Sequence, residues 1–224
     1  MENYVLAIVG NKGGIGKTTL AYNFLYWLTQ QDISAILIDC DNDQYSSADF
    51  ALERKEAGIK PELVVKNMPT KDLRKNIVKL GKKYEVIIIE FGKANEDIEE
   101  VDRNSALELA IKLADKVVMP IQPSPVDVKT IEKVEAKLPL KARDVETVLV
   151  PNRIKSKDQL NALLRIQPDL EYFEFSKSFI KDRVCYQDSL GDEGRSVLEI
   201  KAKSKSEKEA KKEFRQLCKE IFYG

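Results

Sequence analysis

The sequence predicts an α/β fold: a single domain with a mostly parallel, twisted sheet flanked by helices. Short apolar runs typical of buried strands alternate along the chain with segments of helical periodicity. This alternation implies strand–helix–strand units with right-handed crossovers, which build parallel sheets. The length of 224 residues suits one large domain over residues 1–224, in which residues 200–224 form a basic segment and a final helix packed on the body.

The amino-acid composition limits which classes of protein this chain can belong to. Hydrophobic residues make up 43% of the chain and charged residues 33%, as in a globular protein with a charged surface. The 37 basic and 37 acidic residues cancel, so a contact with nucleic acid would need a local basic patch. Because the chain contains no histidine, a hydrolytic reaction would have to use carboxylates, lysines and a metal ion. We expect no transmembrane helix and no signal peptide. Three widely spaced cysteines fit a reducing cytoplasm.

A glycine-rich loop lies between the first apolar run, residues 5–9, and the first segment of helical periodicity. Its glycines let backbone N–H groups turn inward, and the helix N-terminus that follows attracts anions. Lys17 would bring its charge to the β- and γ-phosphates of a nucleotide, and the Thr18 hydroxyl would bind Mg²⁺. The alternative is a turn with solvated lysines, but the flanking strand and helix favour a phosphate site. The predicted nucleotide-binding residues here are Lys12, Gly13, Gly14, Ile15, Gly16, Lys17, Thr18 and Thr19.

This loop departs from the general phosphate-loop pattern in two places. Asn11 stands where the first glycine should be, and Lys12 is a second lysine inside the loop. In this form the loop resembles the deviant Walker A motif of the ParA/MinD ATPases. The resemblance implies the P-loop NTPase fold and ATP/ADP with Mg²⁺ as cofactors. It also implies that Lys12 reaches the nucleotide of a partner subunit, so the ATP-bound form would be a homodimer.

The second predicted strand, residues 34–41, ends in Asp39 and Asp41. Acids at the carboxyl end of a strand lie where open α/β sheets bind ligands, and residues two apart point to the same side. Mg²⁺ and an attacking water both need carboxylate oxygens, although solvated loop acids are the alternative. The stretch is similar to the ParA pattern D-x-D-P-Q, which implies that Asp39 lies near the metal and Asp41 orients the water. Asn42 replaces the proline, and one extra residue precedes Gln44.

The middle of the chain carries fewer signals. We expect a helix over residues 45–57, an outer strand over 61–65 and a helix capped by Thr70. The apolar run over 84–90 predicts a buried strand that ends in Glu90 and looks like the Walker B strand. The resemblance implies that Glu90 acts on Mg²⁺ through water, in place of the aspartate usual in the family. The alternative is that Glu90 begins a loop.

Two later segments match the ParA pattern. Residues 120–127 predict a stiff loop, because proline fixes φ and restricts the preceding residue. They resemble the segment P-x-Q-P-S-P-x-D, especially of small plasmid-type ParA proteins. A strand over 145–150 leads to Pro151, Asn152 and Arg153, a position that lies near adenine in the family. A turn-forming asparagine is the alternative.

The C-terminal part predicts a basic surface and a packed helix. Residues 175–198 resemble the ParA pattern I-x-x-R-V followed by G-x-S-V. A helix over 206–222 places its apolar residues on one face, with lysines and glutamates interspersed on the exterior. We favour packing on the body over a contribution to DNA binding, and expect no stable membrane association, because the glutamates interrupt a membrane-binding face. Candidate DNA phosphate contacts are Lys181, Arg183, Arg195, Lys201, Lys203 and Lys205.

These resemblances together imply a ParA-type DNA partition ATPase in the cytoplasm, associated with the nucleoid. Lys12, Lys17 and Asp41 would be catalytic, and Thr18, Asp39 and Glu90 would bind the metal. ATP would drive dimerisation and binding to non-specific double-stranded DNA, and hydrolysis, stimulated by a ParB-like centromere-binding protein, would reset the dimer. The alternatives are an ATPase that positions a non-DNA cargo, a MinD-like membrane-associated regulator, a metabolic or metal-carrier enzyme, and a relative that does not hydrolyse ATP.

Overall fold

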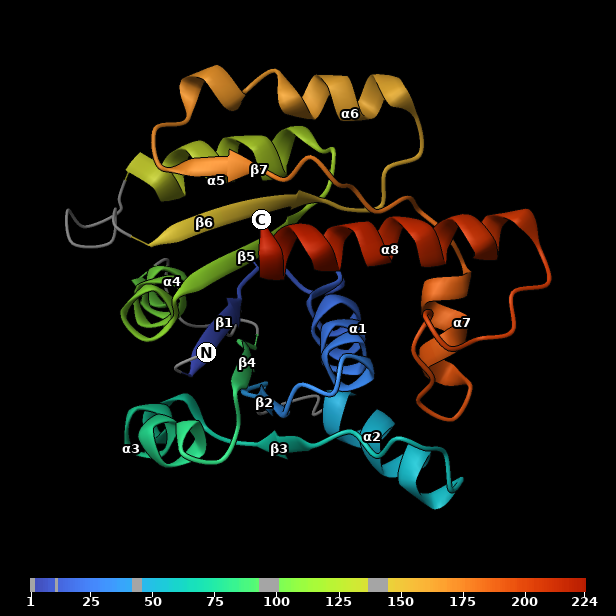
Figure 1. Ribbon diagram of the computed structural model, residues 1–224. Helices are drawn as coiled ribbons and strands as arrows, with labels where there is room; N and C mark the ends of the chain where they lie inside the picture. The colour runs from blue at the N-terminus through green and yellow to red at the C-terminus, as the bar shows by residue number, and fades with distance from the viewer. Residues whose placement is uncertain (1–2, 11, 42–45, 93–100, 137–144) are drawn as a thin grey trace.

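The computed structural model describes residues 3–10, 12–41, 46–92, 101–136 and 145–224. Its centre is a seven-stranded sheet with the order β3-β2-β4-β1-β5-β6-β7, in which every pairing is parallel (Figure 1). The predicted α/β fold with a parallel sheet is confirmed. The strands are β1 Tyr4–Ile8, β2 Ala35–Asp39, β3 Val65–Asn67, β4 Val86–Glu90, β5 Lys116–Ile121, β6 Glu146–Pro151 and β7 Phe173–Phe175.

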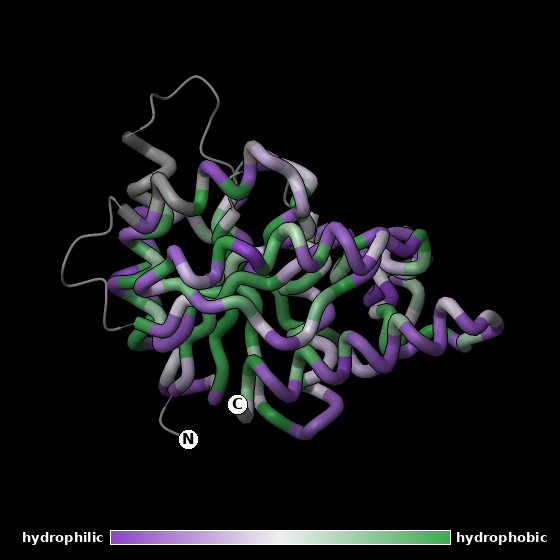
Figure 2. Tube along the Cα trace, turned by 90° about the horizontal axis from the view of Figure 1, so that it is seen from above, coloured by the Kyte–Doolittle hydropathy of each residue, from purple (hydrophilic) through white to green (hydrophobic). Residues whose placement is uncertain are grey.

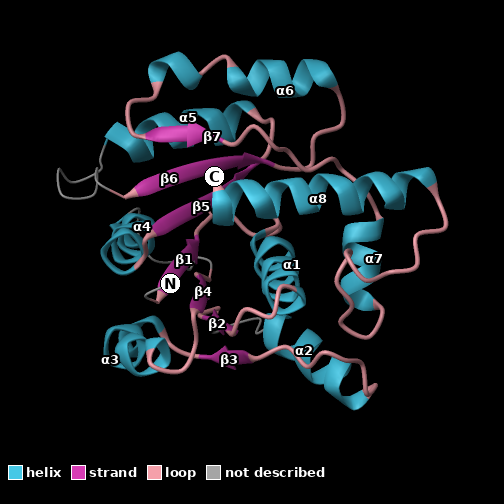
Figure 3. Ribbon diagram, in the orientation of Figure 1, coloured by secondary structure: helices cyan, strands magenta, loops and turns pink. Residues whose placement is uncertain are grey.

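Helices cover both faces of this sheet (Figures 1 and 3). One face carries α1 Lys17–Gln30, α2 Ser46–Glu56, α7 Cys185–Gly191 and α8 Lys205–Tyr223. The other carries α3 Thr70–Gly81, α4 Val101–Leu113, α5 Pro125–Ala136 and α6 Lys157–Leu164. A short 3₁₀ helix, η2, spans Gln167–Asp169. Because the carboxyl ends of parallel strands share one edge, the described residues that directly follow β1, β2, β4 and β6 lie at that edge.

The core has two layers, one on each side of the sheet. Along β1, Leu6 and Ile8 face α1 and α8, whereas Val5 and Ala7 face α4, as the alternation of strand side chains requires. Figure 2 shows the apolar strands in the middle and polar residues along the outer helices. The strands covered on both faces therefore carry continuous apolar runs in the sequence, which is typical of parallel sheets.

The last helix, α8, closes the molecule over α1. Ser204 and Glu207 form a capping box at its start. Its buried residues are Ala210, Phe214, Leu217, Cys218 and Ile221. At its end, Phe222 stacks on Trp27 of α1 with ring centroids 5.6 Å apart. Within the described ranges, none of the helices has both the length and the apolar character needed to cross a membrane.

Three local expectations differ from the structure. The outer strand expected over residues 61–65 is present as the edge strand β3 but begins only at Val65, and residues 61–64 precede it. The carbonyl oxygen of Pro61 accepts a hydrogen bond from Arg54 Nε at 2.7 Å. Thr70 is the first residue of α3 and makes no capping hydrogen bond, because Pro69 occupies the cap position. Residues 120–127 are not one loop: β5 ends at Ile121, and α5 begins at Pro125, which suits the first position of a helix.

Candidate functional site

The glycine-rich loop connects β1 to α1 at the carboxyl edge of the sheet. Gly14 and Gly16 have φ values of 68° and 104°, in the left-handed region that favours glycine. A Cβ on Gly16 would also lie 2.3 Å from Asn152 Nδ2. Asn152, which follows β6, donates from Nδ2 to the carbonyl oxygen of Ile15 at 2.6 Å. The loop is therefore fixed by its own glycines and by a side chain from the end of a distant strand.

Six of the eight predicted loop residues and the three predicted metal ligands line one hollow of about 130 Å³, here called the loop hollow; Lys12 and Ile15 are not among its lining residues. Lys17, the first residue of α1, is only 6% exposed there. Its ammonium group and the N-terminus of α1 supply positive charge for phosphate oxygens. The lining residues are Gly13, Gly14, Gly16, Lys17, Thr18, Thr19, Asp39, Asp41, Ser46, Glu90 and Arg153. The acids from β2 and β4 thus lie beside the glycine-rich loop.

The Glu90 carboxylate at the end of β4 is 2% exposed and held by two hydroxyl groups. Thr18 Oγ1 donates to Oε1 at 2.5 Å, and Ser47 Oγ donates to Oε2 at 2.7 Å. Burial raises the pKa of Glu90 to about 7, although the hydrogen bond from Thr18 opposes this shift. Glu90 is therefore a buried group inside the site and not the start of a solvated loop.

Asp39, at the end of β2, is the second buried acid of the loop hollow. Its Oδ1 accepts from the backbone N–H of Asp41 at 3.0 Å, and its Oδ2 from that of Ser47 at 3.2 Å. Burial raises the pKa of Asp39, and these two backbone hydrogen bonds oppose the rise. Mg²⁺ is usually bound by oxygen ligands through one or two carboxylates together with phosphates and waters. The Thr18 hydroxyl, Asp39 and Glu90 fit such an ion.

A second hollow of about 130 Å³, here called the side hollow, lies next to the loop on the side of α7. Arg153, which adopts a φ of 55°, lines both hollows. Asn152 lines the side hollow as well, but both ends of its amide are engaged, since Oδ1 accepts from the Arg153 N–H at 3.0 Å. A role of Asn152 at adenine stays a prediction. Two candidate DNA contacts, Lys181 and Arg183, line this hollow.

Lys12 points to a different neighbour. Its Nζ lies 2.7 Å from Oδ2 of Asp127 in the first turn of α5; the Lys12 side chain is 40% exposed and that of Asp127 is 1% exposed. Ser124 Oγ also donates to this carboxylate oxygen, at 2.8 Å. The segment that resembles P-x-Q-P-S-P-x-D therefore binds the extra lysine. The sequence did not reveal this contact; the only signal was that an acid follows β5, the neighbour of β1.

The six candidate DNA contacts do not form one open patch. Arg183 donates to Glu213 Oε1 at 2.9 Å and to Glu209 Oε2 at 3.0 Å, and its side chain is only 10% exposed. Arg195 forms ion pairs with Asp192 at 3.2 Å and Glu193 at 2.8 Å.

The four lysines of the set, Lys181, Lys201, Lys203 and Lys205, are exposed. Lys205 Nζ lies 4.0 Å from Glu209. The loop residues after Asp41 that depart from the ParA pattern, including Asn42 and Gln44, lie outside the described residues.

Ser47 lies at this site but was not predicted from the sequence. It is completely buried in the first turn of α2 and contacts the carboxylates of both Asp39 and Glu90. The available signal was a serine pair at the start of the helix that comes after the acidic end of β2.

Comparison with known proteins agrees with this geometry. Residues 6–196 match the CobQ/CobB/MinD/ParA nucleotide binding domain. A relative named "Maintenance of carboxysome distribution protein A" from Gloeobacter kilaueensis is 25% identical over 221 residues, covering 97% of this chain and 93% of that protein.

Two solved structures share the fold. The septum site-determining protein MinD of Pyrococcus horikoshii, complexed with Mg-ADP, has a TM-score of 0.71 and 16% identity, covering 99% of this chain and 96% of the other. A plasmid partition protein of Borrelia burgdorferi has a TM-score of 0.64 and 17% identity, covering 98% and 99%. The chain therefore belongs to the CobQ/CobB/MinD/ParA family of nucleotide-binding domains, as the resemblance predicted.

Proposed function

We propose that the chain is an ATP-hydrolysing switch that forms a homodimer when ATP is bound and uses this cycle to position a cargo. The observation that carries the proposal is the separation of two lysines in one loop. Lys17 is buried at the loop hollow, beside Thr18 and Glu90. Lys12 is 40% exposed and pairs with Asp127. This separation suits two different roles: Lys17 binds the nucleotide of its own subunit, and Lys12 contacts the nucleotide of a partner subunit.

Each residue of the loop hollow has a role in this proposal. The loop backbone and Lys17 bind the phosphates, and Thr18, Asp39 and Glu90 hold Mg²⁺, which neutralises phosphate charge when it is bound. Asp41 orients the attacking water, and Lys17 stabilises the negative charge that develops on the transferred phosphoryl group. The side hollow, which Asn152 and Arg153 line, takes the base of the nucleotide, and Pro151 precedes these two residues at the end of β6.

Dimerisation requires Lys12 to exchange partners. In the monomer its ammonium group pairs with Asp127, and in the dimer it contacts the nucleotide of the partner subunit. The Lys12 side chain is 40% exposed, but that of Asp127 is only 1% exposed, so taking the lysine away from this buried carboxylate has a cost. The contact of Lys12 with the partner's nucleotide must compensate for that cost. ATP then shifts the equilibrium towards the dimer by its greater affinity for that state.

For the cargo, we propose first a DNA partition system, in which the dimer binds non-specific duplex DNA at the nucleoid and a ParB-like protein stimulates hydrolysis. Lys181, Lys201, Lys203 and Lys205 are the proposed phosphate contacts, because they are exposed. Arg183 and Arg195 are left out, since acids of the same chain already bind them. A dimer doubles the number of lysines and hence the counterions released from DNA.

A second candidate cargo is a protein assembly. The similarity to a carboxysome distribution protein extends over 97% of this chain and therefore favours this alternative beside DNA partition. The site residues would be the same, and only the partner would differ.

The test is phosphate release from ATP and Mg²⁺, measured with random-sequence duplex DNA, with the product of the adjacent gene, and with both. We expect slow basal turnover that rises when DNA and partner are present together. Gel-shift binding to duplex with ATP should weaken steeply with salt. Turnover without any DNA binding would favour a non-DNA cargo, and a chain that neither binds nor hydrolyses ATP would refute the proposal.

A further inference from the structure

One residue outside the predicted motifs contacts both acids assigned to the metal. Ser47 Oγ donates to Glu90 Oε2 at 2.7 Å, and the backbone N–H of Ser47 donates to Asp39 Oδ2 at 3.2 Å. Glu90 Oε1 is bound by Thr18 at 2.5 Å, so both oxygens of this carboxylate have a hydroxyl donor. Glutamate is one methylene longer than the aspartate usual at this position, and here its carboxylate contacts both hydroxyls. The orientation of Glu90 therefore depends on Ser47 as much as on the phosphate loop.

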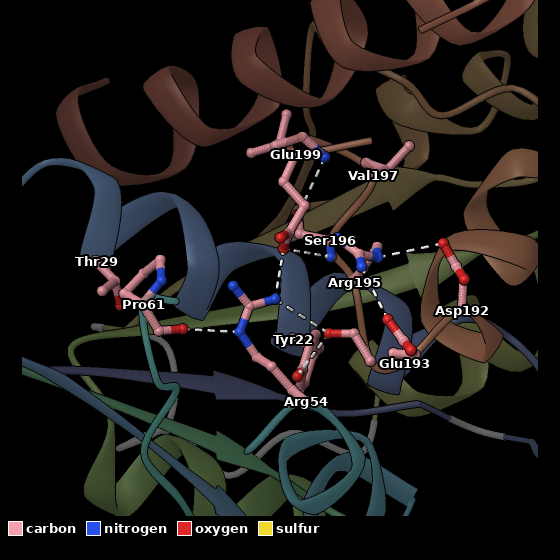
Figure 4. A network of polar contacts seen from close by, with 12 residues as sticks. Tyr22, Thr29, Arg54, Pro61, Asp192, Glu193, Arg195, Ser196, Val197 and Glu199 are labelled. Carbon is pink, nitrogen blue, oxygen red and sulfur yellow. Dashed lines mark hydrogen bonds and ion pairs between the residues drawn. The ribbon is translucent and has the colours of Figure 1, made fainter. Parts of the chain in front are cut away.

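Ser47 is in turn fixed by the helix that carries it. Arg54 follows two helical turns later, about 10 Å along α2, and is completely buried. Its Nε donates to the carbonyl oxygen of Pro61 at 2.7 Å, and its Nη1 lies 2.6 Å from Glu199 Oε2. Figure 4 shows the guanidinium between these two partners. Pro61 lies in the segment between α2 and β3, and Glu199 lies before α8, so Arg54 joins α2 both to the segment that follows it and to a distant part of the chain.

The backbone before Glu199 also lies directly against α2. Gly194 adopts a φ of 64°, and a Cβ on it would lie 2.0 Å from the carbonyl oxygen of Phe50. The carbonyl oxygen of Gly194 accepts a hydrogen bond from Tyr22 Oη of α1 at 2.9 Å. With this contact and the Arg54 pair, α2 has little freedom to shift or rotate, which fixes the position of Ser47 at its other end.

We propose that Ser47 is a positioning residue for the magnesium site and that the Arg54–Glu199 pair anchors the helix that carries it. The proposal rests on the proposed nucleotide function. Groups that orient metal ligands through hydrogen bonds typically change metal affinity by 10–100-fold when they are removed. A purely structural role of α2 would change stability instead and would leave the affinity for Mg²⁺ intact.

The test measures binding of a fluorescent ADP analogue in EDTA and across a Mg²⁺ series, with the full chain. We expect Ser47→Ala to need about tenfold more Mg²⁺ for half-maximal enhancement of ADP binding, with unchanged ADP affinity in EDTA. Ser47→Thr keeps the hydroxyl and should restore the wild-type requirement. Glu53→Gln, at an exposed position of the same helix, is the matched control. A folded Ser47→Ala variant with wild-type Mg²⁺ dependence would overturn the proposal.

A second variant keeps the test decisive if Ser47→Ala does not fold. The double substitution Arg54→Met with Glu199→Met replaces the buried ion pair by apolar side chains, a change that often leaves stability unaltered. Fluorescence of Trp27, the single tryptophan of the chain, reports folding in urea. The double variant should be folded and should bind Mg²⁺ several-fold more weakly; an unchanged Mg²⁺ requirement would count against the proposal. Absence of Mg²⁺-dependent ADP binding in the wild type would refute the proposed function itself.

Discussion

Two charged regions of this chain behave differently. At the carboxyl edge of the sheet, Asp39 ends β2, Glu90 ends β4, and Lys17 and Thr18 begin the helix that the loop after β1 leads into; all four line one hollow. In the C-terminal region, by contrast, Arg183 is bound by Glu209 and Glu213. Strand ends of a parallel sheet must meet, so charges placed there are brought together by topology. Charged side chains on surface loops and helices instead pair with the residues that tertiary packing places beside them.

The first prediction tests the group of charges at the carboxyl edge of the sheet by removing Asp41, for which we expect the largest effect. Asp41→Ala should reduce ATP turnover by about 10²-fold, because the attacking water loses the group that orients it. ATP affinity should remain close to that of the wild type, because Lys17 and the loop still bind the phosphates. Single-turnover hydrolysis and equilibrium binding separate the two quantities. Normal turnover would remove Asp41 from the mechanism.

The second concerns Arg183, for which we expect a role in stability and not in DNA binding, because acids of the same chain bind it. Its side chain is 10% exposed and forms ion pairs with Glu209 and Glu213. Arg183→Met should lower the free energy of unfolding by about 2 kcal/mol, because it leaves partly buried carboxylates without their cation. Urea denaturation measures this effect. The salt dependence of DNA binding should not change, and a reduced dependence would restore Arg183 to the DNA surface.

The third prediction concerns how the Mg²⁺ affinity of the loop hollow depends on pH. The pKa of Glu90 is raised to about 7 by burial, so below pH 7 the carboxyl binds a proton that competes with Mg²⁺. Mg²⁺ affinity in the presence of ADP should therefore rise about tenfold from pH 6 to pH 8. Isothermal titration at several pH values measures it. Because ADP also titrates in this range, Glu90→Gln is the control: its Mg²⁺ affinity is expected to depend less on pH.

The fourth, with the smallest expected effect, tests the exposed lysines. Lys203→Ala removes one candidate phosphate contact from each subunit of the dimer without touching the core. Stability should stay within about 0.5 kcal/mol of the wild type, whereas the slope of log affinity for DNA against log salt should fall by about two, one for each subunit. An unchanged slope for this variant and for Lys201→Ala would place the DNA contacts elsewhere on the protein.

A comparison of the sequence-based predictions with the structure, residue by residue, shows what the sequence can predict. The parallel sheet follows from the apolar runs, and the structure confirms it. The positions of Asp39 and Glu90 beside the glycine-rich loop follow from acids placed at strand ends, and these residues line one hollow. Ser47 and Asp127 were not predicted, because their roles depend on which strands are neighbours. Thr70 failed as a cap because Pro69 already occupies that position. Sequence patterns record local chemistry, whereas partners from distant segments depend on packing.

The central claim is that Lys12 acts across a dimer that ATP induces. Its most direct test is the molar mass in solution, by light scattering, of Asp41→Ala with ATP and Mg²⁺, compared with the same variant carrying Lys12→Ala. We predict a dimer for the first protein and a monomer for the second, with both monomeric in ADP. A dimer that forms equally well without the Lys12 side chain, or a first protein that stays monomeric in ATP, would contradict the claim.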